Sequence, residues 1–180
     1  GIKHATGDVI GILNSDDFFE DSSVISDVVR HFNLNPLADL IIGDVVYVDP
    51  LNVEKITRFY SSKKFRRSKL RFGWMPPHAA TFIKKDVYQR LGSYSTDFKI
   101  SADYELFVRM LLVHSLVYSK IDQVLTRMRT GGVSSSGLKS KFLLNSEIVK
   151  ACRDNGVYTN IFLVILKIPM KFLELFRRPV

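Results

Sequence analysis

The sequence predicts an α/β fold with a mixed, mostly parallel sheet, from its composition and from the order of its apolar segments. Its 180 residues are 46% hydrophobic and 12% aromatic, which suffices for one sizeable core. Short apolar runs alternate with segments of helical periodicity, as is typical of layered α/β proteins. The single cysteine, Cys152, excludes an internal disulfide framework and a thiolate zinc site.

The first half of the chain contains three predicted strands and one helix. Asp8–Leu13 is apolar and bounded by turn formers, as in a strand buried on both faces. A capped helix is expected to begin at Asp21 or Ser22 and to end near Asn33–Pro36. Its apolar residues at helical spacing are Val24, Ile25, Val28, Val29 and Phe32. Asp39–Val48 predicts a second strand, and Glu54–Tyr60 can pair with it as a hairpin.

The second half continues the alternation of strands and helices. A Gly92 stop and apolar residues at helical spacing define the helices, and β-branched runs define the strands. The predicted elements are a strand at Ala80–Ile83, a helix through Val87 and Leu91, a helix at Ala102–Val113, a strand within Val117–Met128 and a helix at Ser140–Asp154.

Polar side chains follow the first predicted strand. Asn14, Ser15, Asp16 and Asp17 bring hard oxygen ligands to the sheet edge where α/β proteins bind ligands. Mg²⁺ or Mn²⁺ suits such a pair of carboxylates, because these ions take few protein ligands and complete their coordination with water and phosphate oxygens. A turn followed by a helix N-cap explains the same residues equally simply.

Four segments closely resemble the family 2 glycosyltransferases of bacterial polysaccharide biosynthesis: GDVIGILNSDDFF, HAATF, GSYSTDFKISADYELFVRM and TRMRTGGVS. The resemblance runs from Gly1 to about Ser136. It implies the GT-A fold, a nucleotide-binding αβα sandwich, here N-terminally truncated because the family's opening strand and nucleobase-binding loop are not found. We therefore expect a partial GT-A domain at 1–137 and a C-terminal region of amphipathic helices at 138–180.

The resemblance also implies roles for the acidic residues. Asp16 and Asp17 would hold Mg²⁺ or Mn²⁺, with Asn14 and Ser15 beside the donor diphosphate, although Asn14 replaces the first Asp of the commoner DxDD pattern. Asp103 matches the family's catalytic base, which takes the proton of the acceptor hydroxyl. The alternative for Asp103 is a carboxylate that merely favours a helix N-terminus.

Three further residues match donor-binding positions of that family. His78 stands in the HAATF segment, where a histidine could touch the donor sugar or the acceptor. Arg127 and Arg129 resemble the late loop near the donor, and a guanidinium group matches the geometry of a diphosphate. A locally bonded histidine and an ordinary solvated loop are the alternatives. Glu105, near the proposed base, is expected to face outward.

Positive charge is concentrated in the middle of the chain. Lys and Arg number 26 against 18 Asp and Glu, and six of these cations fall within Lys63–Arg71. A solvated face, contact with a membrane or an acidic acceptor, and nucleic-acid binding all remain open for this segment. No nucleic-acid motif accompanies it, so nucleic acid is not the expected partner.

The C-terminal Val157–Phe176 is apolar but interrupted by charges. A spanning helix needs about 20 predominantly apolar residues, so an interfacial helix is the better interpretation; packing on the domain or on a second copy is the alternative. We expect a cytoplasmic enzyme that can associate with the inner face of the membrane. It would move a sugar from a nucleotide-sugar donor to a glycan or lipid-linked acceptor with inversion. A truncated, inactive membrane-associated binding module and a basic nucleic-acid-binding domain are the competing hypotheses.

Overall fold

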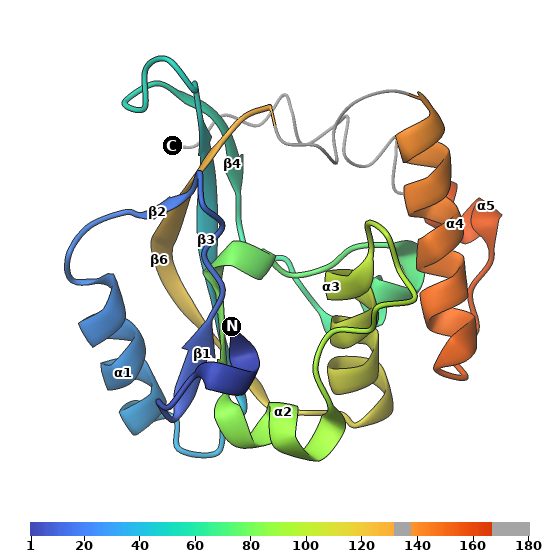
Figure 1. The fold of residues 1–180 in the computed structure, drawn as a ribbon, viewed down its shortest axis with the longest axis horizontal. Coiled ribbons are helices and arrows are strands. Elements are labelled where there is room, and N and C mark those ends of the chain that lie inside the picture. The colour runs from blue at the N-terminus through green and yellow to red at the C-terminus, as the bar shows by residue number, and fades with distance from the viewer. Residues whose placement is uncertain (132–137, 167–180) are drawn as a thin grey trace. The chain divides into compact units, whose positions relative to one another are not determined.

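The computed structural model describes residues 1–131 and 138–166, and its contacts divide the chain into two units (Figure 1). The first unit contains Gly1–Lys64, Pro76–Ser93 and Leu116–Thr130; the second contains Phe65–Met75, Tyr94–Ser115 and Gly131–Val180. Each unit is therefore assembled from three separate stretches of sequence. The predicted boundary between residues 137 and 138 stays a prediction.

A mixed six-stranded sheet forms the first unit. Its strands are β1 (Val9–Gly11), β2 (Phe18–Phe19), β3 (Leu40–Val48), β4 (Ile56–Tyr60), β5 (Thr81–Lys84) and β6 (Tyr118–Arg129). The order is β1-β5-β3-β6-β2, and β4 pairs with β3. The predicted α/β class with a mixed sheet is confirmed, and the three-layer sandwich stays a prediction.

The expectation of a mostly parallel sheet is wrong. Among the described strands, β3 and β6 form the only parallel pair, and the other four pairs are antiparallel. The physical reason is the length of the connections. A short turn from β3 into β4 permits only the antiparallel direction, whereas parallel neighbours need a long crossover such as the one that separates β3 from β6.

The helix α1 (Val24–Leu34) packs on the sheet through one face (Figure 1). Val24, Val28 and Phe32 are buried against β3 and β6, while Ile25 and Val29 are exposed. Val24, Val28 and Phe32, three of the apolar residues whose spacing predicted this helix, therefore form its buried face. The short elements η1 (Ile2–His4), η3 (His78–Ala80) and α2 (Lys85–Leu91) complete the unit, and Gly92 ends α2 as predicted, with a φ of 84°.

The second unit is helical. It contains η2 (Arg67–Phe72), α3 (Ala102–Phe107), the π-helical turn η4 (Val108–Val113), α4 (Leu138–Asp154) and α5 (Ile161–Ile165). Fully buried side chains from α3 and η4 fill its core, among them Tyr104, Phe107 and Met110. The predicted helix at Ala102–Val113 is present, but its second half is π-helical. None of the helices among the described residues is long and apolar enough to cross a bilayer.

One short strand was not predicted, and part of one predicted segment lies outside the described residues. The two-residue β2 was not predicted, because a strand of that length leaves no periodic signal. Residues 167–180, the second half of the expected interfacial segment, lie outside the described residues.

A tight contact between β3 and β6 provides a test of this fold. A Cβ atom at Gly43 would lie 2.3 Å from Cδ1 of Leu125, which is fully buried. We predict that Gly43→Ala destabilises the protein by about 1–3 kcal/mol, because an extra methyl group overpacks the core. The midpoint of urea unfolding measures the loss.

Gly7→Ala is the matched control, because a Cβ atom there meets only the carbonyl oxygen of Val9 at an ordinary 3.7 Å. It should leave the urea midpoint within about 0.5 kcal/mol of wild type. Equal midpoints for the two variants would show that β3 and β6 are not packed as described.

Candidate functional site

The strand directions bring most of the predicted site residues to one edge of the sheet. β5 runs antiparallel to both β1 and β3, and β6 runs parallel to β3, so β1, β3 and β6 point the same way. Asn14–Asp17 follows the end of β1, and Arg129 is the last residue of β6. His78 directly precedes the oppositely directed β5 and therefore lies on the same side. α/β sheets bind ligands at this edge.

The segment Asn14–Asp17 forms a tight turn between β1 and β2. The backbone N–H of Asp17 donates to the carbonyl of Asn14 at 3.1 Å, and Nδ2 of Asn14 donates to Oδ2 of Asp17 at 2.8 Å. Asp16 is exposed, whereas Asp17 is buried, with 9% of its surface accessible. The amide of Asn14 therefore orients the buried carboxylate of the pair.

The environment of Asp17 disfavours its charged form. Burial raises its pKa above the ordinary 3.8, and the neighbouring charge of Asp16 raises it further; the hydrogen bond from Asn14 and the positive charge of Arg129 oppose the shift without cancelling it. Two carboxylates in consecutive positions therefore form an electrostatically unfavourable pair. A bound cation would remove the repulsion.

The two arginines of β6 have different surroundings. Arg127 is held by Glu20 through two hydrogen bonds of 2.7 and 2.8 Å, and it also donates to the carbonyl of Val53 at 3.0 Å. Arg129 donates to the backbone carbonyl of Asp16 at 2.6 Å and lies over the ring of Phe18. Arg129 thus contacts the acidic turn directly, whereas Arg127 forms an ion pair with Glu20, the residue that follows β2.

His78 is half-buried in a segment that β6 holds in place. The hydroxyl of Thr126 donates to the carbonyl of Ala79 at 2.8 Å, and the hydroxyl of Thr81 donates to the carbonyl of Pro77 at 2.7 Å. Thr126 also pairs with Phe19 of β2. The same residue of β6 therefore anchors the strand that follows Asp17 and the turn that carries His78.

Asp103 lies in the second unit, as the second residue of α3. Its side chain is half-buried, and its Oδ1 accepts a hydrogen bond of 2.7 Å from the backbone N–H of Tyr104. The ring of Tyr104 is buried, and its hydroxyl donates to the carbonyl of Leu70. Asp103 therefore sits on a well-packed helix start, where its carboxylate is also favoured by the helix dipole.

The expectation that Glu105 faces outward is wrong. Its side chain is buried, with 5% of the surface accessible, and accepts hydrogen bonds of 2.9 and 2.8 Å from Arg109 and one of 3.1 Å from Asn155. Arg109, one helical turn further along the chain, and Asn155 supply the hydrogen bonds that a buried carboxylate needs. Glu105 is therefore stable in a buried position.

Glu147 is a residue that the sequence analysis missed. It is buried on α4 and contacts the segment that precedes α3. The available signal was an acidic residue on the apolar face of a predicted helix, between Leu144 and the pair Ile148 and Ala151 at helical spacing. A carboxylate on the apolar face of a helix needs hydrogen-bond donors when it is buried, so its presence there indicates a contact with another segment.

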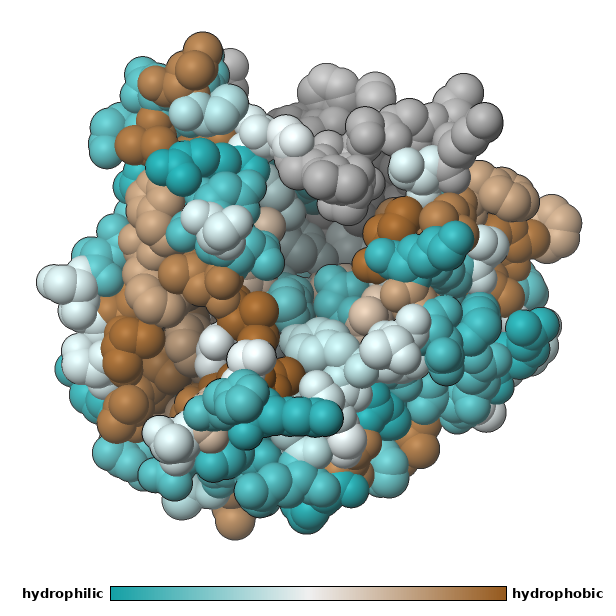
Figure 2. Space-filling view, in the orientation of Figure 1, coloured by the Kyte–Doolittle hydropathy of each residue, from teal (hydrophilic) through white to brown (hydrophobic). Residues whose placement is uncertain are grey.

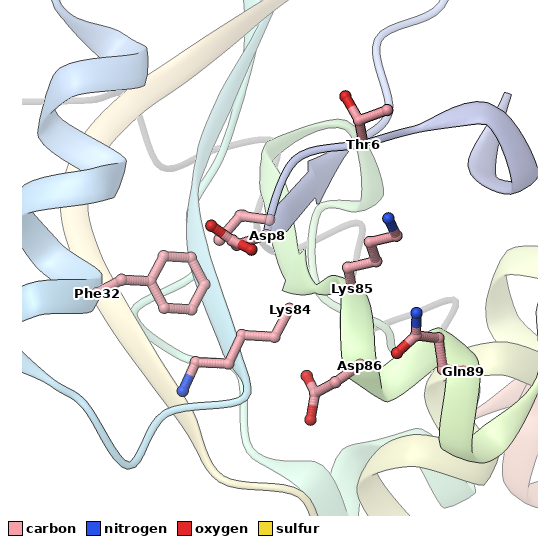
Figure 3. Close-up of a pocket in the computed structure, with 8 residues that line it drawn as sticks. Thr6, Asp8, Phe32, Lys84, Lys85, Asp86 and Gln89 are labelled. Atoms are coloured by element: carbon pink, nitrogen blue, oxygen red, sulfur yellow. The ribbon is translucent and has the colours of Figure 1, made fainter.

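A separate pocket of about 430 Å³ lies at the opposite end of β1 (Figure 3). Asp8, Phe32, Lys84 and Gln89 are among its lining residues. Nζ of Lys84 donates to the carbonyl of Pro36 at 2.8 Å and lies over the ring of Phe32, so this amine is already engaged. None of the predicted site residues lines this pocket.

The acidic turn offers a limited donor set for a metal ion. Within residues 1–131 and 138–166, no group of three or more His, Cys, Asp and Glu side chains converges on one point. Asp16 and Asp17 fit Mg²⁺ or Mn²⁺, which bind through one or two carboxylates when substrate phosphates supply further oxygens. They do not fit a zinc site, which would need three or four protein ligands.

Comparisons with known proteins relate the chain to glycosyltransferases. No protein-family model matches it. An uncharacterized glycosyltransferase of Mycobacterium tuberculosis is 31% identical over 136 residues, which are 75% of this chain and 50% of that protein. A PGL/p-HBAD biosynthesis glycosyltransferase of Mycobacterium bovis is 24% identical over 144 residues, 79% of this chain and 54% of that protein. The chain spans about half the length of the curated relatives it matches.

The raised pKa of Asp17 predicts a stability that depends on pH. A carboxyl group whose pKa is higher in the folded state makes the protein less stable as pH rises from 3.8 through the folded pKa. Asp17→Asn removes this titration, so the variant should unfold at a higher urea concentration than wild type at pH 7. The two midpoints should converge at pH 3.

Asp16→Asn removes the same charge from an exposed position and serves as the control. Its effect on the urea midpoint at pH 7 should be smaller than that of Asp17→Asn. A lower midpoint for Asp17→Asn than for wild type at pH 7 would contradict the unfavourable setting of Asp17.

Proposed function

We propose that this chain is part of an inverting, metal-dependent glycosyltransferase of family 2 with the GT-A organisation. Its donor is a nucleotide-sugar, its acceptor a hydroxyl of a glycan or lipid-linked molecule, and its role the biosynthesis of cell-surface polysaccharide. The observation that carries the proposal is the acidic turn Asn14–Asp17 at the ligand-binding edge of the sheet, beside Arg129, in a chain similar to proteins named as glycosyltransferases.

The mechanism assigns binding to the first unit and proton transfer to the second. Asp16 and Asp17 would hold Mg²⁺ or Mn²⁺, which would neutralise the charge of the leaving diphosphate. The donor phosphates are bound by Asn14, Ser15 and Arg129, because N–H and O–H donors suit phosphate oxygens. Arg127 takes part less directly, because it is paired with Glu20. His78 lies at the same edge of the sheet and contacts the donor sugar or the acceptor.

Asp103 acts as the general base. It accepts the proton of the acceptor hydroxyl while the hydroxyl oxygen forms a bond to the anomeric carbon of the donor sugar. The bond between that carbon and the diphosphate oxygen breaks, and the nucleoside diphosphate leaves with the electron pair. Attack from the face opposite the leaving group inverts the configuration. A positioned carboxylate typically contributes a factor of about 10²–10⁴ to such a step.

We predict that Asp103→Asn lowers turnover by about 10²–10⁴ while donor affinity is retained, because only the base is lost. Asp17→Ala is the contrasting variant and should instead weaken Mn²⁺-dependent donor binding. Release of nucleoside diphosphate from UDP-glucose, UDP-galactose and GDP-mannose measures turnover, with water as the surrogate acceptor, and calorimetry measures binding. Wild-type turnover in Asp103→Asn would refute its role, and Mn²⁺-independent donor binding would refute that of Asp17.

We also propose that the second unit contacts an anionic membrane surface, where a lipid-linked acceptor would reside. Its exposed apolar side chains gather near α5, and Figure 2 shows brown and tan atoms at the right-hand edge, over α4 and α5. Tyr158 and Phe162 are 74% and 77% exposed. The hydroxyl of Thr159 donates to the carbonyl of Arg71 at 2.5 Å, which places the basic η2 next to them.

The neighbouring basic segment is consistent with this partner. Phe65 and Leu70 of Lys63–Arg71 are buried, while Lys64, Arg66 and Arg71 are exposed. Exposed cations attract anionic head groups, and adjacent aromatic side chains can enter the acyl boundary. Nucleic acid would use the cations without needing the aromatic surface.

We predict that the protein sediments with vesicles of phosphatidylcholine and phosphatidylglycerol but not with phosphatidylcholine alone. Phe162→Ser should weaken this binding about tenfold, because it removes an aromatic side chain that enters the bilayer. Leu51→Ser is the control, since Leu51 is 97% exposed but belongs to the first unit, whereas α5 belongs to the second. Equal vesicle binding by the two variants would rule out this surface.

A further inference from the structure

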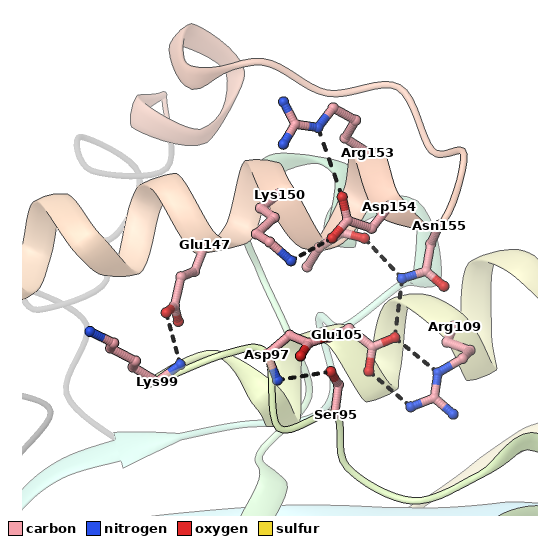
Figure 4. A network of polar contacts seen from close by, with 11 residues as sticks. Ser95, Asp97, Lys99, Glu105, Arg109, Glu147, Lys150, Arg153, Asp154 and Asn155 are labelled. Atoms are coloured by element: carbon pink, nitrogen blue, oxygen red, sulfur yellow. Dashed lines mark hydrogen bonds and ion pairs between the residues drawn. The ribbon is translucent and has the colours of Figure 1, made fainter.

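The carboxylate of Glu147 holds three consecutive backbone N–H groups. Its Oε1 accepts from Lys99 at 2.8 Å, and its Oε2 accepts from Ile100 at 3.0 Å and from Ser101 at 2.9 Å. Figure 4 shows Glu147 reaching from α4 to the backbone of Lys99. These residues form the last three positions before α3, the helix that carries Asp103.

This contact replaces the local cap of α3. Ser101 is the N-cap residue, but its side chain makes no cap hydrogen bond. The first bond of the helix runs from the N–H of Glu105 to the carbonyl of Ser101, at 2.9 Å. Glu147 binds the N–H of Ser101, and so it fixes the peptide unit directly before the one whose carbonyl accepts this first helical bond. Asp103 follows two residues later.

The helix α4 and the residue that follows it, Asn155, contact α3 at two further points. The hydroxyl of Tyr104 lies 3.6 Å from Sγ of Cys152, and Nδ2 of Asn155 donates to Oε1 of Glu105 at 3.1 Å (Figure 4). Glu147, Cys152 and Asn155 therefore contact three successive sections of the segment around Asp103. Of these contacts, only that of Glu147 precedes Asp103 and sets the direction in which its helix begins.

The carboxylate is well suited to this task. Burial by itself raises the pKa of Glu147, but the hydrogen bonds from Lys99, Ile100 and Ser101 outweigh burial and bring the pKa below its ordinary 4.5. Glu147 is therefore ionised at neutral pH. Bonds from N–H groups to an ionised acceptor are stronger than neutral ones, and removing the acceptor leaves buried donors without a partner.

We propose that Glu147 is a positioning residue for the general base Asp103: its carboxylate orders residues 99–101 and thereby holds the first turn of α3 in the productive orientation. This inference rests on the proposed function, because the role of Asp103 does. The reaction needs a base within hydrogen-bond reach of the acceptor hydroxyl, so small displacements of the helix start reduce turnover more than substrate binding.

Hydrogen exchange tests the ordering without any substrate. In the full chain, Glu147→Gln should speed the exchange of the amides of residues 99–105 at least tenfold, because the neutral amide is a weaker acceptor. Exchange over Leu40–Val48 of the first unit should stay at the wild-type rate and report that the variant is folded. Unchanged exchange at residues 99–105 would overturn the inference.

Kinetics then separates positioning from a merely structural role. In Mn²⁺ with each of the three nucleotide-sugars, Glu147→Gln should lower kcat about 10- to 100-fold with KM for the donor unchanged. Glu147→Asp, which keeps the carboxylate, should recover part of kcat. Asp154→Asn is the matched control on α4, because its exposed ion pair with Lys150 does not touch α3; it should leave kcat and KM at wild-type values.

The outcomes distinguish this inference from the proposed function. If Asp103→Asn is inactive while Glu147→Gln keeps wild-type kcat, the positioning role is wrong and the proposed function stands. If Asp103→Asn keeps wild-type turnover, the role of Asp103 fails, and that of Glu147 fails with it. If Glu147→Gln loses the exchange protection of Leu40–Val48 as well, Glu147 supports the whole fold, and a dedicated positioning role is excluded.

Discussion

The parallel pairing of β3 with β6 is the constraint on which the proposed binding edge depends. β6 brings Arg129 to the acidic turn, pairs with the strand that follows Asp17, and through Thr126 holds the turn that carries His78. None of these contacts is local in sequence. The long connection between β3 and β6 must close before any of them forms, so the edge is a property of the completed sheet.

Local patterns predicted the elements and the hairpin of β3 with β4, but not the pairing of the other strands. The helical spacing of Val24, Val28 and Phe32 and the stop at Gly92 correctly marked α1 and α2. Strand direction depends on how each connection closes, and the expectation of a mostly parallel sheet followed from the alternation of elements alone. The burial of Glu105 likewise depends on a long-range partner, Asn155, which lies 50 positions away and gives no local signal.

The sequence indicated candidate site residues, but it did not indicate the partners that hold them in place. The structure brings Arg129, at the end of β6, into contact with the turn that contains Asn14, Asp16 and Asp17, whereas Arg127 is paired with Glu20, a partner that no local pattern indicated. Long-range partners such as this have no fixed spacing. Glu147 is the same case, since it contacts Lys99 across 48 positions of the chain.

The two acidic groups of the proposed reaction are held on opposite electrostatic principles. Asp17 is placed where burial and Asp16 disfavour its charge, which lowers the folding stability, and a bound cation would reverse this effect. Asp103 sits at a helix start that favours negative charge, and its support comes from Glu147, whose own charge is satisfied by the backbone. A cation site benefits from unrelieved charge, because the ion supplies the relief. A general base benefits from a carboxylate that is held in a fixed position, and each of the two environments matches the task proposed for it.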